Sequence, residues 1–101
     1  MTFDDETIRR VWGKGRTVGT DAGGTWRKDE CGAWIRWQDY GSTDTDLGYG
    51  WEIDHITSVE HGGTDALSNL RPLQWKNNRA KQAGRLKCVV TSSGDSNVSV
   101  E

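Results

Sequence analysis

The sequence predicts a single small α+β domain, and three observations support that fold class. The chain has 101 residues, which is close to the commonest length of one domain. Its 13 glycines favour many turns and short elements over a helical bundle. Apolar residues recur at helical spacing in one early segment, whereas later segments alternate as strands do. We therefore take residues 1–101 as one domain, organised around a core at residues 51–83.

The first expected element is a short helix within residues 4–14. Acidic residues open this segment, and Ile8, Val11 and Trp12 follow at i, i+3 and i+4 spacing, which places them on one helical face. The glycines that follow limit the length of the helix. The chain contains six tryptophans, so a few large rings are expected to supply much of the core.

A β-hairpin is expected next, after a loop over residues 17–25. Its arms are residues 26–29 and 33–37, and the turn between them is Glu30-Cys31-Gly32. Residues 38–50 are polar and rich in glycine, which predicts a surface connection.

Two further features lie outside the central segment. Residues 86–91 are β-prone, and residues 97–100 are expected either to pair back as a short strand or to fray. Cys31 and Cys88 belong to no CxxC pair. We expect both cysteines to be reduced and packed, with a disulfide or a zinc site as the alternatives.

Charge is distributed unevenly along the chain. The formal net charge is −2, yet residues 66–94 contain no Asp or Glu. The basic residues in that stretch are Arg71, Lys76, Arg79, Lys81, Arg85 and Lys87. A polyanion senses the local surface, because salt screens charges beyond about 8–10 Å. The alternatives are a solvated helix face and a phosphate-contacting surface, and we favour the second, with the first four residues as candidates.

The central segment begins with strand-like alternation over residues 51–56, which predicts a strand with one buried face. An isolated histidine at the end of a strand is commonly only a satisfied polar residue. Here thirteen residues separate His55 from Asn69, and eight more separate Asn69 from Asn78. That ordered spacing singles out His55.

This pattern resembles the HNH endonuclease family, also called the His-Me finger or ββα-metal nucleases. The matching residues are Asp54-His55, Gly62-Gly63, Asn69-Leu70 and Asn78. The resemblance implies a ββα-metal core, to which this chain adds an N-terminal helix and a β-hairpin. Many relatives carry two CxxC pairs that hold a structural zinc. These pairs are absent here, so we expect the apolar flanks to hold the scaffold together.

The resemblance also implies a role for each residue of the pattern. His55 is the expected general base, because a neutral imidazole accepts a proton from water near neutral pH. Asp54 and Asn78 are the expected ligands of one Mg²⁺ or Mn²⁺ ion, which stabilises the leaving 3′-oxygen. Asn69 is expected to tie the loop that holds the histidine ring.

Other residues near the pattern are given simpler roles. His61 is expected in a surface loop, with a ligand role as the alternative. Gly62-Gly63 are expected to adopt positive φ angles, with a phosphate cradle as the alternative. Trp75 is expected in the core beneath the helix, with base stacking as the alternative. Asn77 is expected to contact either nucleic acid or water. Gly84 is expected to end the helix.

Together these features predict a metal-dependent endonuclease that hydrolyses DNA, or alternatively RNA. One other possibility is a non-catalytic nucleic-acid-binding module. Another is a phage packaging or mobile-element nuclease that is active only in a complex. A homodimer or a larger protein partner would supply a second cut. No run approaches the roughly 20 apolar residues of a membrane span, and the acidic N-terminus is not a signal peptide. We therefore expect a cytoplasmic protein of bacterial or phage origin.

Overall fold

The computed structural model describes residues 3–19, 24–82 and 84–100. Within these residues the chain is a small α+β fold whose strands pair antiparallel in three sheets. The helices are α1 (Asp5–Trp12) and α2 (Trp75–Arg79). The strands are β1 (Arg16–Thr17), β2 (Trp26–Lys28), β3 (Trp34–Arg36), β4 (Trp51–His55), β5 (Leu70–Gln74), β6 (Val90–Ser93) and β7 (Ser96–Ser99).

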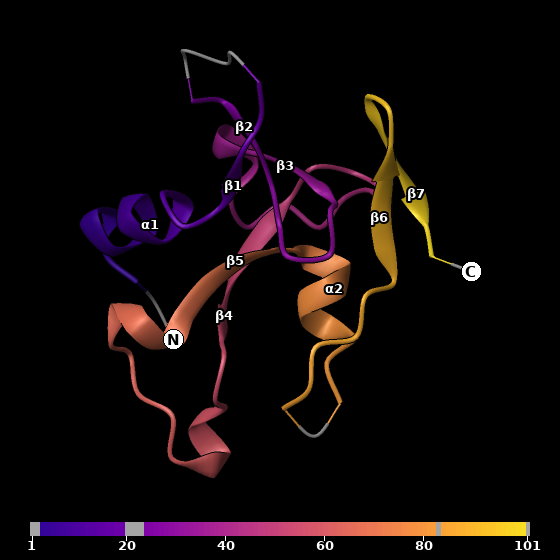
Figure 1. Cartoon of the computed structure of the whole chain (residues 1–101). Helices are drawn as coiled ribbons and strands as arrows, with labels where there is room; N and C mark the ends of the chain where they lie inside the picture. The colour runs from indigo at the N-terminus through magenta and orange to yellow at the C-terminus, as the bar shows by residue number, and fades with distance from the viewer. Residues whose placement is uncertain (1–2, 20–23, 83, 101) are drawn as a thin grey trace.

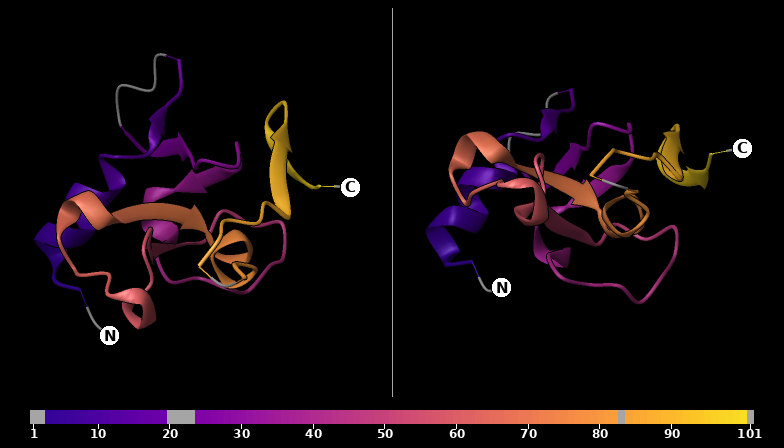
Figure 2. Two further views of the ribbon diagram at one scale, coloured as in Figure 1. Left: turned by 60° about the horizontal axis from the view of Figure 1, so that its bottom comes forward. Right: turned by 90° about the horizontal axis from the view of Figure 1, so that it is seen from below.

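The β4–β5 ribbon lies at the centre of the molecule (Figures 1 and 2). Helix α1 packs near the start of β5, and α2 with the β6–β7 hairpin lies at its other end. The β1–β2–β3 sheet packs beside the ribbon through β3. Three short 3-10 turns complete the described elements, at Trp37–Asp39, Val59–His61 and Leu67–Asn69.

Helix α1 confirms the helix expected within residues 4–14. Asp4 caps it by accepting a hydrogen bond of 2.8 Å from the Thr7 N–H, which satisfies one of the unpaired donors of the first turn. Hydrogen bonding by the Thr7 side chain, together with this main-chain bond, holds the pKa of the exposed Asp4 carboxyl below its usual value. Val11 and Trp12 are buried on the face that the spacing predicted.

The apolar core lies between α1, β3 and the central ribbon. Its buried residues are Val11, Trp12, Ile35, Trp51, Ile53 and Leu70. The Trp12 and Trp51 rings lie 5.1 Å apart between centroids and supply much of the core area, as expected for a chain of this size. The other four tryptophans are only half-buried or exposed.

The expected β-hairpin is confirmed by β2 and β3, in which Arg27 pairs with Ile35. The loop expected over residues 17–25 was wrong at its start. Thr17 belongs to β1 and pairs with Arg27, because the chain leaving α1 turns back along the hairpin edge. Residues 20–23 of that loop lie outside the described part. Of the two alternatives near the C-terminus, the structure has the paired strand, although β6 begins only at Val90.

A buried carboxylate, Asp29, ties the hairpin turn to the start of α2. Its side chain accepts four N–H donors at 2.8–3.0 Å, from Cys31, Ala33, Gln74 and the amide of Asn77. Burial raises the pKa of the Asp29 carboxyl, while the four donors oppose that effect. Apolar flanks were expected to hold the scaffold together, and the structure adds a buried polar network that joins these segments.

Cys31 and Cys88 form a disulfide, with their Cα atoms 5.4 Å apart. The expectation of two reduced, packed cysteines was wrong. The reason is tertiary. The segment that follows α2 runs back along the hairpin turn, where the Thr91 hydroxyl donates to the Cys31 carbonyl at 2.8 Å. The disulfide and the Asp29 network thus join the same two parts of the chain.

Helix α2 is shorter than expected. Gln74 caps its start by accepting N–H bonds from Lys76 and Asn77. The helix ends at Arg79, and Ala80 is its C-terminal cap, so Gly84 does not end it. Gly84 instead occupies a later turn, with φ of +77°, which Gln82 and Arg85 close by pairing. The early end leaves Lys81 outside the helix.

Candidate active site

A hollow of about 420 Å³ lies between the end of β4, the turn at residues 58–61, and the end of α2 with the segment after it. It is lined on one side by Asp54 and His55 and on the other by Asn78 and Lys81. Asp54 and His55 are the last two residues of β4, which follow Trp51 and Ile53 out of the core. The structure therefore brings together three of the residues that the HNH-like pattern singled out.

His55 is held by a carboxylate that the pattern did not include. Its side chain is 18% exposed, and its Nε2 lies 2.7 Å from Oδ1 of Asp65. An ionised carboxylate only accepts hydrogen bonds, so this contact places the proton of a neutral His55 on Nε2. Nδ1 is then the ring nitrogen that can accept a proton.

Asn69 ties the loop between β4 and β5, in the position that the pattern assigned to it. Its side-chain oxygen accepts the Thr57 N–H at 2.8 Å. Its amide group donates to the carbonyls of Thr57 at 3.0 Å and Thr64 at 2.8 Å. The Asn69 side chain thus joins two parts of the loop. Because it holds Thr64, it places Asp65, which follows Thr64, within reach of His55.

The two glycines of this loop have different reasons to be glycine. Gly62 has φ of +90°, which confirms the expected positive angle. Gly63 does not have a positive φ, so that part of the expectation was wrong. A Cβ atom at Gly63 would lie 1.7 Å from the Thr57 carbonyl oxygen and 2.9 Å from the Asn69 amide nitrogen. Gly63 is therefore needed for the close approach of the two ends of the loop.

Asp54 lies between two cations. Its side chain is 4% exposed, and its Oδ2 accepts a bond of 2.7 Å from Arg71 Nε. Its Oδ1 accepts a bond of 2.7 Å from Lys81 Nζ, which also donates to the carbonyl of His55. The Lys81 ammonium shows that Oδ1 faces a position where a cation is held.

The adjacent asparagines of α2 have separate environments. Asn78 lines the hollow, and its amide group donates to Glu52 at 3.1 Å. Asn77 points into the interior and is fully buried, so the expected contact with nucleic acid or water was wrong. Burial disfavours the charged form of Glu52, yet hydrogen bonds from Arg79 and Asn78 hold its pKa below the usual value.

The four basic residues expected to contact phosphate all form ion pairs. Arg71 is 11% exposed and bridges Asp54 and Glu30, so the expectation that it contacts phosphate at the surface is corrected. The other three pairs are Lys76–Asp46, Arg79–Glu52 and Lys81–Asp54. Much of the positive charge counted in residues 66–94 is therefore neutralised by partners from elsewhere in the chain.

A divalent metal was the expected cofactor. The hollow offers side-chain oxygens of the type that such a metal binds, but it offers few of them. Among the described residues, no three His, Cys, Asp or Glu side chains gather as a metal-holding group. Asp54 offers a carboxylate and Asn78 an amide oxygen, which are ligand types that a hard cation prefers. A metal at Asp54 would replace the Lys81 ammonium there.

A protein-family model described as HNH endonuclease matches residues 30–84. The chain belongs to the HNH endonuclease family. This match covers more than half of the chain and includes every residue of the pattern above. Membership indicates a nuclease that acts on nucleic acid. Searches of curated proteins and of solved structures find no match. No helix among the described residues is long and apolar enough to cross a membrane.

Sequence reasoning about this HNH chain missed two residues of the site. Asp65 gave no signal, because a lone aspartate in a polar loop is ordinary. His61 is exposed in its loop as expected, yet it also lines the hollow, with Nδ1 at 2.7 Å from the Ser58 hydroxyl. Trp75, expected in the core, is half-buried, and its indole N–H donates to the Thr45 carbonyl at 2.9 Å.

Proposed function

We propose that this chain is a metal-dependent endonuclease that hydrolyses DNA phosphodiesters, with His55 as the general base. The observation that carries the proposal is the arrangement of His55 in the hollow. Asp65 engages Nε2, so Nδ1 remains to accept the proton of an attacking water. His55 lies beside Asp54, the candidate metal ligand, at the end of one strand.

Four residues that line the hollow then have chemical tasks. His55 takes the proton from water as the new P–O bond forms and the bond to the 3′-oxygen breaks. Asp54 and Asn78 would hold one Mg²⁺ or Mn²⁺ ion, which supplies charge neutralisation at the phosphate and at the leaving oxygen. Lys81, already directed at the same position, is the proposed phosphate contact among the predicted basic residues. Lys76 and Arg79 would contact phosphate only by exchanging their carboxylate partners.

One observation favours a second candidate function. Asp54 is already neutralised by both Arg71 and Lys81, so the hollow is electrostatically satisfied without a metal. A chain that keeps this arrangement would bind nucleic acid and do no chemistry. The two functions differ in one respect that can be measured, which is whether a divalent ion turns binding into cleavage.

Supercoiled plasmid tests the proposal directly. The purified chain is incubated with Mg²⁺, with Mn²⁺ and with EDTA, and His55→Ala is run in parallel. Endonuclease function predicts nicked circles that require metal and that carry 5′-phosphate ends. It also predicts their loss in the variant. Binding without nicking at every metal tested would favour the non-catalytic module, or a nuclease that needs a protein partner or a second copy.

A further inference from the structure

The β1–β2–β3 sheet carries aromatic and basic side chains on the face away from the core. The register places Arg16 opposite Lys28, and Lys28 opposite Trp34. Trp26 lies two residues from Lys28 along β2, so it shares their face. The other face carries Ile35, which is fully buried in the core. None of these outward residues has a part in the proposed chemistry.

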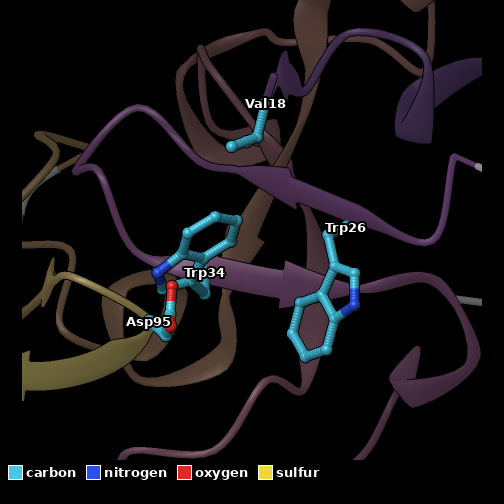
Figure 3. A pocket seen from close by; sticks show the side chains of 4 residues that line it. All are labelled: Val18, Trp26, Trp34 and Asp95. Atoms are coloured by element: carbon cyan, nitrogen blue, oxygen red, sulfur yellow. The ribbon is translucent and has the colours of Figure 1, made fainter. Parts of the chain in front are cut away.

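A hollow of about 320 Å³ opens between the two tryptophans of this face (Figure 3). The rings of Trp26 and Trp34 lie 6.0 Å apart between centroids, at 86° to each other. Among the described residues, Val18, which follows β1, and Asp95, from the β6–β7 turn, also line it. The Trp34 indole N–H donates to the Gly94 carbonyl at 2.7 Å, which fixes that ring. The hollow has the size of a small-ligand site with a preformed aromatic wall.

Two cations of this face lack a carboxylate partner among the residues that the structure describes. Among the described residues, neither Arg16 nor Lys28 forms an ion pair, whereas Lys76, Arg79 and Lys81 all do. The Lys28 ammonium lies 4.7 Å from the centre of the Trp34 ring. A cation next to an aromatic wall is the combination that binds single-stranded nucleic acid, because bases stack on rings while phosphates pair with cations.

We propose that this face binds an unpaired stretch of nucleic acid, with one base in the Trp26–Trp34 hollow and the neighbouring phosphates on Arg16 and Lys28. Only an unpaired base can enter, because duplex bases are stacked and paired on both sides. The Asp95 carboxylate at the edge of the hollow can accept a hydrogen bond from a base amino group.

The same two cations connect this face to the candidate active site. Arg16 and Lys28 line a second hollow of about 180 Å³, which extends past Glu30 to Arg71. The Arg71 guanidinium in turn donates to Asp54 in the catalytic hollow. The inference rests on the proposed function for the identity of the ligand as nucleic acid, and it adds a preference for substrates with a single-stranded stretch beside the cut.

Binding in EDTA tests this inference without any cleavage. The anisotropy of a labelled oligonucleotide is followed as the whole chain is added, for a single strand and for the matching duplex. We expect the single strand to bind more tightly. Trp34→Ala should weaken that binding by about 5- to 150-fold, the usual effect of losing one base–aromatic stack. Trp75→Ala is the matched control and should leave binding unchanged. It also removes a half-buried ring, whose indole N–H donates to a carbonyl and which an arginine covers.

A charge variant keeps the test informative if Trp34→Ala does not fold. Replacing both Arg16 and Lys28 by alanine should reduce the slope of log K against log salt by about 1.4, which corresponds to two phosphate contacts on a single strand. Replacing Arg9 and Arg10 on α1 removes the same charge and should leave the slope unchanged.

The outcomes separate this inference from the proposed nuclease function. Unchanged single-strand affinity in a folded Trp34→Ala and an unchanged slope in the charge variant would overturn the inference, even if the chain nicks plasmid. Binding that is as tight to the duplex, or absent altogether, would also overturn it. Trp34-dependent binding in a chain that never nicks DNA would support the inference and contradict the nuclease proposal.

Discussion

Replacing Asn77 by alanine should destabilise the fold severely, whereas replacing its neighbour Asn78 should not. The Asn77 side chain is fully buried and uses all of its hydrogen-bonding capacity. Its amide group donates to Asp29 at 3.0 Å and to the Val90 carbonyl at 2.9 Å. Its oxygen accepts the N–H groups of Val89 and Val90, both at 2.8 Å. The residue thus joins α2 to β6 and to the hairpin turn.

The expected loss follows from the partners that alanine would leave behind. Two main-chain N–H groups would lose their acceptor, and the buried Asp29 carboxylate would lose one of its four donors. An unsatisfied buried group costs about 1–3 kcal/mol, so Asn77→Ala should lower the free energy of unfolding by about 3–5 kcal/mol. Asn78 is half-buried, and its side chain donates one hydrogen bond, to Glu52. Asn78→Ala should therefore lower the free energy of unfolding by about 1 kcal/mol or less.

Urea and thermal unfolding, followed by circular dichroism without reductant, measure both effects. Asn77→Ala should lower the thermal midpoint by more than about 10 °C. Asn78→Ala should unfold close to wild type and lose metal-dependent nicking. An Asn77→Ala protein within about 1 kcal/mol of wild type would refute the assignment of this side chain to the buried network. Equal destabilisation by both variants would refute the distinction between the two asparagines.

Three further predictions concern the loop, the disulfide and a paired carboxylate. Asp65→Ala should slow nicking by about 10- to 100-fold without weakening plasmid binding in EDTA, because His55 loses the carboxylate that orients its ring; an unchanged single-turnover rate would exclude that role. Reducing the Cys31–Cys88 disulfide, which closes a separation of 57 residues, should lower the free energy of unfolding by about 3–4 kcal/mol, measured by urea titration with and without reductant. The pKa of Glu52 is held low by hydrogen bonds that outweigh its burial, so its stabilising contribution is present above pH 4.5 and is lost as pH falls through its lowered pKa. Urea unfolding at several pH values should therefore show that Glu52→Gln flattens the dependence of the free energy of unfolding on pH in that acidic range. A variant with the same slope as wild type would contradict a lowered pKa for Glu52.

Local patterns predicted much of the fold. Spacing placed Val11 and Trp12 on the buried face of α1, and alternation placed Trp51 and Ile53 inward. These features depend on residues a few positions apart, which periodicity reports directly. The role of Asn69 in tying the loop was predicted from the family pattern, and the structure shows the hydrogen bonds through which it does so.

Contacts between distant segments could not be predicted in the same way. Asp29 bonds to Asn77 across 48 positions, and Cys31 meets Cys88 across 57. No local spacing encodes either approach. The expectation that Arg71 contacts phosphate was wrong for a related reason. A count of charges in residues 66–94 does not reveal that the β4–β5 register sets Arg71 opposite Asp54. The pairing of His55 with Asp65 likewise depends on how the loop closes.

The most direct test of a nuclease centred on His55 compares the two histidines that line the hollow. Single-turnover nicking of supercoiled plasmid is measured with Mg²⁺ for wild type, His55→Ala and His61→Ala, and plasmid affinity is measured in EDTA. His55→Ala should lower the rate by about 100-fold or more at unchanged affinity, as expected for the loss of a general base. His61→Ala should nick at nearly the wild-type rate. A His55→Ala protein as fast as wild type, or loss of nicking in His61→Ala alone, would contradict the assignment of His55 as the base.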